Sequence, residues 1–415
     1  MRVGVLVSGR RALLPIFLLV LVDVFGLTLV IPLLAIYAEQ FKASPLQATL
    51  LVTTYALFQL VSGPLLGRAS DHVGRKPLLL LSQVGTLIGF LVMANAQSLW
   101  MLYLARVIDG ATAGNLSLAQ AYIADNTPPE KRAKSFALIG IAFGVGFFIG
   151  PWVTGVLSAH YGLRAPIFLA ACMSALSILC TLFLLPHQKP AAKADGAPGP
   201  GGKRLGLLQW GAYGQYLSRP VLGGLLFQFL AYMFCFALFT SGFALFAERS
   251  FTWNAKPFGP REIGYLFAYS GFLGIILQGG LIGRLVKRFG EPALVMTGFV
   301  ALSFAYVGLG LVHGIPPLMA VTTVAAYGNG VLRPSLTSLI SRSADRSEQG
   351  VVLGLNQSLA SAAQIGAPVL AGTLIGAGQL FIWEALAAAA AGVGLLLWRW
   401  GSARVNAVAS AAPGT

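Results

Sequence analysis

Three charged residues stand inside apolar stretches of this sequence. Asp23 lies within residues 12–37, and Arg106 and Asp109 lie three residues apart within residues 98–124. An ionised carboxylate in hydrocarbon is costly, so it takes up a proton or acquires a partner. A buried carboxylic acid that binds and releases a proton could couple the protein's activity to a proton gradient. Arg106 and Asp109 share one helix face at this spacing, and pairing lowers the cost of placing either in a membrane.

Each of these residues also has a purely structural interpretation. Asp23 could serve helix packing through a hydrogen bond, and Arg106 with Asp109 could form a structural salt bridge. Uncharged polar residues in other apolar stretches could line a cavity for a moderately apolar solute, or could bond neighbouring helices. These residues are Gln59, Asn115, Gln120, Gln228, Gln278, Asn356, Gln357 and Gln364.

The composition indicates the setting of these residues. Hydrophobic residues make up 56% of the 415 and charged residues 10%, against about 25% charged in soluble domains. With a mean hydropathy of +0.77, the chain needs an apolar phase around it and is predicted to be an all-α polytopic membrane protein. The three cysteines lie in apolar runs without metal-ligand or disulfide spacing. We therefore expect no metal, no cofactor and no nucleotide site, since a P-loop motif is also missing.

Twelve apolar runs are long enough to cross a bilayer as helices. Their approximate ranges are 12–37, 47–66, 77–95, 98–124, 135–158, 164–185, 220–247, 262–283, 292–312, 315–341, 350–376 and 379–398. The first run is too long for a signal peptide and contains Asp23, so it is expected to remain as a helix.

The basic residues indicate orientation. Of the 28 Lys and Arg residues, 21 fall in the termini, the central loop and the loops on that same side, and five fall in the alternate loops. By the positive-inside rule, both termini lie in the cytoplasm. The net charge of +15 thus reports topology in the cell inner membrane and argues against nucleic acid as a partner. Arg333 and Glu384 also fall inside predicted spans, and we expect both to reach the interface by snorkelling.

The chain divides near its midpoint. Residues 189–204 (KPAAKADGAPGPGGKR) form a polar, Pro- and Gly-rich stretch typical of a flexible linker. We predict a six-helix bundle at 1–186, a cytoplasmic linker at 187–218, a second six-helix bundle at 219–400 and a cytoplasmic tail at 401–415. The two halves repeat: GPLLGRASDHVGRKP (63–77) aligns with GGLIGRLVKRFGEP (279–292). Such repeats are typical of transporters with a site near the membrane midplane.

Three groups of residues resemble the signature motifs of the major facilitator superfamily. They are Gly67, Asp71, Gly74, Arg75 and Lys76; Arg106 and Gly110; and Gly146, Gly150, Pro151 and Gly155. The last group is similar to the antiporter motif of the drug/proton antiporters. At finer grain, LYLARVIDGATAGN, AYIADNTPPEKRAKSF and GFFIGPWVTG resemble the tetracycline/proton antiporters.

The resemblance implies roles for these residues. Asp23, Arg106 and Asp109 would carry proton coupling. The residues from Gly67 to Lys76, with Asp125 as the partner of Arg75, would form a cytoplasmic latch, although His72 replaces the usual Arg or Lys. Gly146, Gly150, Pro151 and Gly155 would act in packing or as a hinge.

These features together predict a monomeric secondary transporter that exports a small amphipathic or drug-like compound, tetracycline-like compounds included, in exchange for protons. Its partners would be the substrate, protons and the lipid bilayer. A proton-coupled symporter that imports a nutrient or metabolite is the main alternative. A membrane enzyme or scaffold is a second one, disfavoured because no catalytic constellation of Ser, His, Cys or carboxylates is present.

Overall fold

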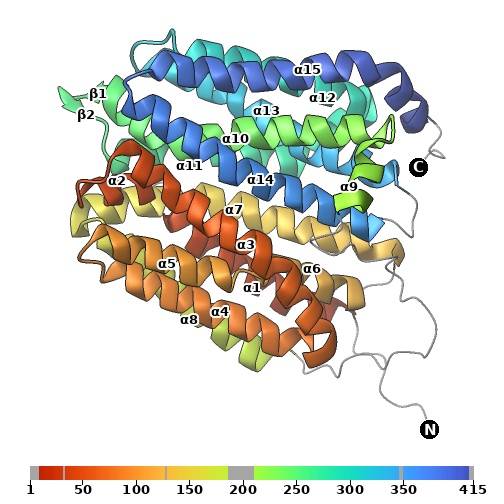
Figure 1. Cartoon of the computed structure of the whole chain (residues 1–415), viewed down its shortest axis with the longest axis horizontal. Helices are drawn as coiled ribbons and strands as arrows, with labels where there is room; N and C mark the ends of the chain where they lie inside the picture. Colours follow the sequence, from red (N-terminus) through yellow and green to blue (C-terminus); the bar gives the residue numbers. More distant parts are fainter. Residues whose placement is uncertain (1–8, 31–32, 127–128, 186–209, 345–348, 411–415) are drawn as a thin grey trace. The chain divides into compact units, whose positions relative to one another are not determined.

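The computed structural model describes residues 9–30, 33–126, 129–185, 210–344 and 349–410. Almost all of these residues are helical, and Figure 1 shows the helices coloured along the sequence. The helices of the first half are α1 (Gly9–Val30), α2 (Leu34–Glu39), α3 (Pro45–Val73), α4 (Arg75–Ala94), α5 (Leu99–Ala111), α6 (Asn115–Asn126), α7 (Pro129–Tyr161) and α8 (Arg164–Leu184). Those of the second half are α9 (Trp210–Leu217), α10 (Leu222–Ser250), α11 (Pro260–Ile276), the π-helical turn η1 (Leu277–Leu281), α12 (Ile282–Leu309), α13 (Ile315–Arg342), α14 (Gln349–Gly376) and α15 (Leu380–Ser410).

The all-α polytopic class predicted from hydropathy is confirmed, and each of the twelve predicted runs coincides with helix. By length and apolarity, nine helical stretches of the described residues qualify as spans. Three of the twelve runs are not counted separately. The predicted fourth run is broken into α5 and α6, and the apolar part of α1 within the described residues is Phe17–Val30. The stretch from α11 to α12 counts once, although Gly290 (φ 77°) interrupts α12 between the eighth and ninth predicted runs.

Two elements lie in segments predicted to be linker and tail. The part of the predicted linker at 187–209 is outside the described residues, whereas 210–217 form α9. Helix α15 runs on through the predicted tail to Ser410. A two-stranded hairpin, β1 (Thr252–Trp253) and β2 (Lys256–Pro257), follows α10. Its turn places Asn254 and Ala255 at φ values of 50° and 61°.

The chain forms two compact units whose boundaries are not those of the linear halves. Unit 1 comprises Met1–Ala43, Thr54–Ala192 and Phe258–Gly271; unit 2 comprises Ser44–Thr53, Lys193–Pro257 and Phe272–Thr415. Each unit therefore includes a short segment from the other half of the sequence. The bundle boundaries predicted above remain a prediction.

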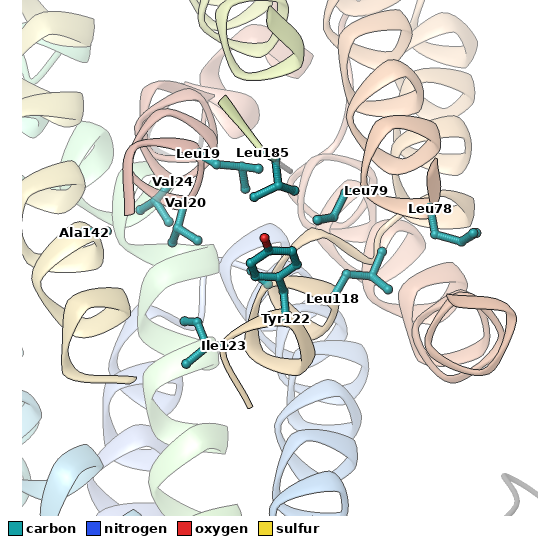
Figure 2. Close-up of a cluster of buried hydrophobic side chains, with 11 residues drawn as sticks. Leu19, Val20, Val24, Leu78, Leu79, Leu118, Tyr122, Ile123, Ala142 and Leu185 are labelled. Carbon is teal, nitrogen blue, oxygen red and sulfur yellow. The ribbon is translucent and has the colours of Figure 1, made fainter. Parts of the chain in front are cut away.

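A cluster of buried hydrophobic side chains packs several helices of unit 1 together. It draws side chains from α1, α4, α6 and α7, with Tyr122 of α6 in the middle (Figure 2). Tyr122 is 1% exposed, and Leu19, Leu79 and Leu118 around it are equally buried. This cluster fixes α6 against α1 and α4, the helices that carry the polar residues described below.

Close packing of α1 on α7 depends on two glycines. A side chain at Gly146 would meet Val24, and one at Gly150 would overlap Thr28. Threonine hydroxyls bond across the same contact: Thr28 Oγ1 donates to the Gly146 carbonyl at 2.9 Å, and Thr154 Oγ1 to the Leu29 carbonyl at 2.7 Å. Small residues and hydroxyls are the means by which membrane helices approach closely.

Gly150→Ala should therefore destabilise the protein. The added methyl group occupies the position of the Thr28 hydroxyl, and such overpacking costs about 1–3 kcal/mol. The measurement is the midpoint of thermal unfolding in detergent. Gly392→Ala is the matched control, because no heavy atom lies within 4 Å of the added methyl group. Equal midpoints for both variants would contradict the tight contact between α1 and α7.

Candidate functional site

The break between α5 and α6 is held by side chains of neighbouring helices. Residues 112–114 are non-helical, which frees backbone groups that must be satisfied within a membrane. Ser82 of α4 donates to the Thr112 carbonyl and accepts from the Gly114 N–H at 2.9 Å. Ser62 of α3 donates to the Gly110 carbonyl at 2.7 Å. These side-chain hydrogen bonds thus stabilise the break within unit 1.

Asp23 ends a chain of hydrogen bonds that crosses three helices. Gln83 of α4 donates through Nε2 to Ser177 Oγ of α8 at 2.8 Å, and Ser177 donates to Asp23 Oδ1 of α1 at 2.8 Å. Gln83 and Ser177 are fully buried. The other carboxylate oxygen, Oδ2, is also buried and has no hydrogen-bond partner among the described residues. Of the two Asp23 carboxylate oxygens, only Oδ1 thus accepts the Ser177 hydrogen bond.

Arg106 and Asp109 form a buried ion pair beside this chain. Arg106 Nη2 lies 3.3 Å from Asp109 Oδ2, and both side chains are 5% exposed. The Arg106 guanidinium also lies over the Tyr55 ring, 5.7 Å from its centroid, and Gln59 donates to the Tyr55 hydroxyl at 3.0 Å. The predicted pairing on one helix face is present, and α3 supplies further partners that the spacing did not indicate.

The same cluster brings α6 to Asp23. Asn115, the first residue of α6, lies beside Asp23, and the Asp23 carboxylate is also within electrostatic reach of Asp109. The N-terminus of a helix attracts negative charge, whereas a second carboxylate repels it. These opposing influences on one carboxylate arise from the break in the helix. All of these polar residues belong to unit 1.

Sequence reasoning missed Ser177 and Gln83. Under the proton coupling predicted from the sequence, Ser177→Ala should reduce substrate-driven proton release several-fold, because it removes the donor that orients Asp23 and leaves the Gln83 amide without its acceptor. Proton release from vesicles containing equal amounts of protein measures this. Ser158→Ala is the control: Ser158 is buried in α7 and bonds only the Gly155 carbonyl of its own helix, at 3.2 Å. Identical rates for Ser177→Ala and wild type would remove Ser177 from the site.

The other predicted cavity residues are more scattered. Gln228 and Asn356 are buried in unit 2, and each has a side-chain oxygen without a hydrogen-bond partner among the described residues. Gln278 and Gln357 are exposed. Gln120 belongs to α6, but its side chain is outside the described part. Of the polar residues predicted to line a cavity, Asn115 and Gln59 thus lie in the charged cluster. That the other predicted residues line a shared cavity stays a prediction.

The segment predicted as a latch is a sharp turn between α3 and α4. Gly74 has φ 104°, a conformation that favours glycine. Arg75 bonds back to Ser70 and to the Gly67 carbonyl, while Lys76 Nζ donates to the carbonyls of Leu182 and Leu185 at 2.8 and 2.7 Å. Lys76 therefore caps the end of α8. The side chains of Asp71 and Asp125 lie outside the described part, so the latch remains a prediction.

Unit 2 repeats this turn with a different charge. Gly290, aligned with Gly74, has φ 77°, which agrees with the sequence repeat. Glu291 follows it where Arg75 follows Gly74. Glu291 Oε1 accepts from Ser338 Oγ at 2.6 Å and lies 3.4 Å from Arg342 Nη2 of α13. In the second half, the Glu291 carboxylate thus links α12 to α13 at this turn.

Gly155 and Pro151 of α7 contact α11 within unit 1. A side chain at Gly155 would press on the Arg261 backbone, and one at Gly264 would meet the Pro151 carbonyl at 2.5 Å. In unit 2, α14 packs in the same way on the start of α3, where Gly372 faces Thr49. All four predicted packing or hinge residues of α7 lie at tight helix contacts; hinge motion remains a prediction.

Glu384 is not placed as snorkelling would place it, whereas the snorkelling expected for Arg333 stays a prediction. Glu384 is 5% exposed, and its Oε2 atom occupies the space that a side chain at Gly310 would need. It is thus buried against the end of α12. Arg333 is exposed but nine residues from the end of α13. Among the described residues, no group of three or more His, Cys, Asp or Glu could hold a metal ion.

This fold is that of a family of membrane transporters. The family model described as Major Facilitator Superfamily matches residues 16–290 and 258–414, and the chain belongs to this family. Its members and the relatives found are transporters of small molecules and not enzymes. The chain is accordingly a multi-pass membrane protein, as predicted from its composition.

Curated relatives include tetracycline resistance proteins. The class C protein of Escherichia coli is 31% identical over 385 residues, 92% of this chain and 93% of its own length. The class H protein of Pasteurella multocida is 32% identical over 380 residues, 87% and 88% of the two chains. Among solved structures, the human organic anion transporter MFSD10 matches with a TM-score of 0.71 and 23% identity, covering 94% of this chain and 99% of its own.

Proposed function

We propose that this protein exports a small amphipathic or drug-like compound in exchange for protons. The observation that carries the proposal is Asp23, an acid in the first predicted span, whose Oδ1 is bonded to Ser177 and whose carboxylate lies beside Asn115. Intramembrane ionisable groups with such partners mark proton and substrate pathways. The ion pair of Arg106 and Asp109 beside it supplies the charges that modulate its proton affinity.

The cycle follows from the cost of charge in the membrane. Protonated Asp23 is neutral and can be buried between the helices at low cost. The ionised carboxylate of Asp23 is stabilised by the Ser177 hydroxyl and by the start of α6. A proton entering from the outside would favour one conformation, and substrate binding with proton release to the cytoplasm the other. The two conformations then differ in proton affinity, which is the requirement for coupling.

Two features favour export over import and guide the choice of substrates. The Gly146, Gly150 and Pro151 pattern of α7 resembles the antiporter motif, and its glycines form the tight contact with α1. The relatives named as tetracycline resistance proteins cover most of the chain. Tetracycline and related amphipathic compounds therefore head the panel of candidate substrates.

The test uses inside-out vesicles with an acidic interior, in which the outward face of the protein meets the acid. Adding an exported compound should release protons from vesicles containing wild type, and Asp23→Asn should abolish this release because the amide cannot carry a proton. A pH-sensitive dye inside the vesicles records the response.

Glu248→Gln serves as the matched control, since Glu248 lies at the end of α10 and is 3.8 Å from Arg249 on a partly exposed surface. It should behave as wild type. Proton release by Asp23→Asn at the wild-type rate and equal expression would refute the role of Asp23. A compound whose addition drives protons inward together with it would favour the symporter instead.

We also propose the inner membrane as location, with both termini in the cytoplasm, on the 21-to-5 distribution of basic residues. In a background where Cys172, Cys180 and Cys235 are replaced by Ala, a membrane-impermeant maleimide should label Asn254→Cys in right-side-out vesicles. It should label Ser410→Cys only in inside-out vesicles. The opposite pattern would invert the topology.

A further inference from the structure

The start of α15 lies between two neighbouring helices of unit 2. Helix α15 packs along both α10 and α12. Trp383 is 1% exposed and donates its ring N–H to the Leu238 carbonyl of α10 at 3.2 Å. The next residue, Glu384, contacts the other neighbour, because its Oε2 atom occupies the space that a side chain at Gly310 of α12 would need. Two adjacent side chains thus join α15 to α10 and to α12.

Glu384 is buried although the end of its helix is near. It is the fifth residue of α15, about 6 Å from the helix start, and a charged side chain at that position usually extends to the interface. Glu384 is instead 5% exposed. In the part of the chain that the structure describes, it has no hydrogen bond and no ion pair. Burying an ionised carboxylate without a partner is costly, so this position suits the neutral, protonated carboxyl group.

The end of α12 gives a second reason for the protonated form. Gly310 is the C-cap residue of α12. The last carbonyl groups of a helix have no partner within it, and they form the negative end of the helix dipole. An ionised carboxylate only accepts hydrogen bonds, so these carbonyls repel it, whereas a protonated carboxyl group can donate a hydrogen bond to one of them.

The helices packed against Glu384 bring no opposite charge to it within the described residues. Helix α14 has no ionisable residue, and the charged residues of α12 end at Glu291, about 28 Å of helix before Gly310. Tyr306, one turn before Gly310, directs its ring to Phe239 of α10. The other ionisable groups at this end of unit 2 are partly or wholly exposed: Glu248, Arg249, Lys256 and His313.

We propose that Glu384 is a second proton-binding residue of this transporter, reached from the outer side of the membrane. It carries a proton while its side chain lies against Gly310. Release of that proton to the outer water makes the side chain leave this contact, which loosens the start of α15 from the end of α12. The inference rests on the proposed function for the role of protons, and on the proposed topology for the side on which residue 384 lies.

Infrared difference spectroscopy tests proton binding directly on the purified full-length protein in nanodiscs. A protonated carboxyl group gives a C=O band that disappears on ionisation. Wild type should keep such a band at neutral pH, where exposed carboxylates are ionised, and should lose it as the pH is raised further. Glu384→Gln should lack this band. Glu248→Gln is the matched control, since Glu248 lies 3.8 Å from Arg249 on a partly exposed surface, and it should keep the band, as should Asp23→Asn.

Thermal unfolding in the same nanodiscs tests the consequence for packing. The midpoint of wild type should fall over the pH range in which the band disappears, because the folded state accommodates the protonated carboxyl group better than the ionised one. The midpoint of Glu384→Gln should not follow this fall, because its amide stays neutral.

Gly310→Ala tests the contact independently, since the added methyl group occupies the position of the Glu384 Oε2 atom. It should displace the carboxyl group, remove the band at neutral pH and lower the unfolding midpoint. In a Glu384→Ala background the same change should lower the midpoint markedly less, because the colliding group is gone. Gly392→Ala of α15, whose added methyl group has no heavy atom within 4 Å, should leave band and midpoint unchanged.

Three results would each overturn the assignment. They are the absence of a Glu384-dependent band at neutral pH, the same pH dependence of the midpoint in wild type and Glu384→Gln, and an equal effect of Gly310→Ala in both backgrounds. None of these measurements needs a transported compound. Failure of the proposed export, tested through Asp23→Asn, is therefore distinguishable from failure of proton binding at Glu384.

Discussion

The cost of leaving a polar group unsatisfied in hydrocarbon governs the arrangement of this molecule. Where the chain departs from helix at residues 112–114, Ser62 and Ser82 reach over from α3 and α4 to bond the exposed backbone groups. Where it carries a carboxylate, at Asp23, a hydroxyl and an amide from two other helices form a relay to it. Both arrangements fix the positions of several helices at once, since each bond joins different helices. The polar residues of unit 1 thus link its helices to one another.

The two halves of the sequence repeat their backbone but not their charges. Gly74 and Gly290 turn the chain in the same left-handed conformation, and a helix resumes after each. The residue that follows is basic in the first half and acidic in the second, where Glu291 faces Arg342. In the predicted spans, unit 1 carries Asp23 and the ion pair of Arg106 and Asp109, and unit 2 carries the exposed Arg333 and the buried Glu384. The repeated backbone turns thus carry different charges in the two halves.

Hydropathy predicted the helices well because crossing a bilayer imposes a length and a composition that can be counted along the chain. The apposition of Arg106 and Asp109 was also predictable, since a spacing of three residues is a local property. Ser177 and Gln83 gave no signal: isolated polar residues are common in membrane helices, and only the fold brings them to Asp23. The break after α5 escaped notice for the same reason, because its stabilising serines are 30 or more residues away. Glu384 lies buried because Gly310, distant in sequence, makes room for it.

Helices α3 and α11 each begin in one compact unit and end in the other. The start of α3 packs on α14, where Thr53 Oγ1 donates to the Ile365 carbonyl at 3.0 Å, and the start of α11 packs on α7. A polypeptide cut between the two sequence halves would therefore yield two fragments, neither of which contains a whole unit. Each fragment would present a bare face of α7 or α14 to lipid until the other intercalated its helix. An engineered protein that combines halves from two different transporters would therefore also need matching starts of α3 and α11, because each packs within the unit formed mainly by the other half.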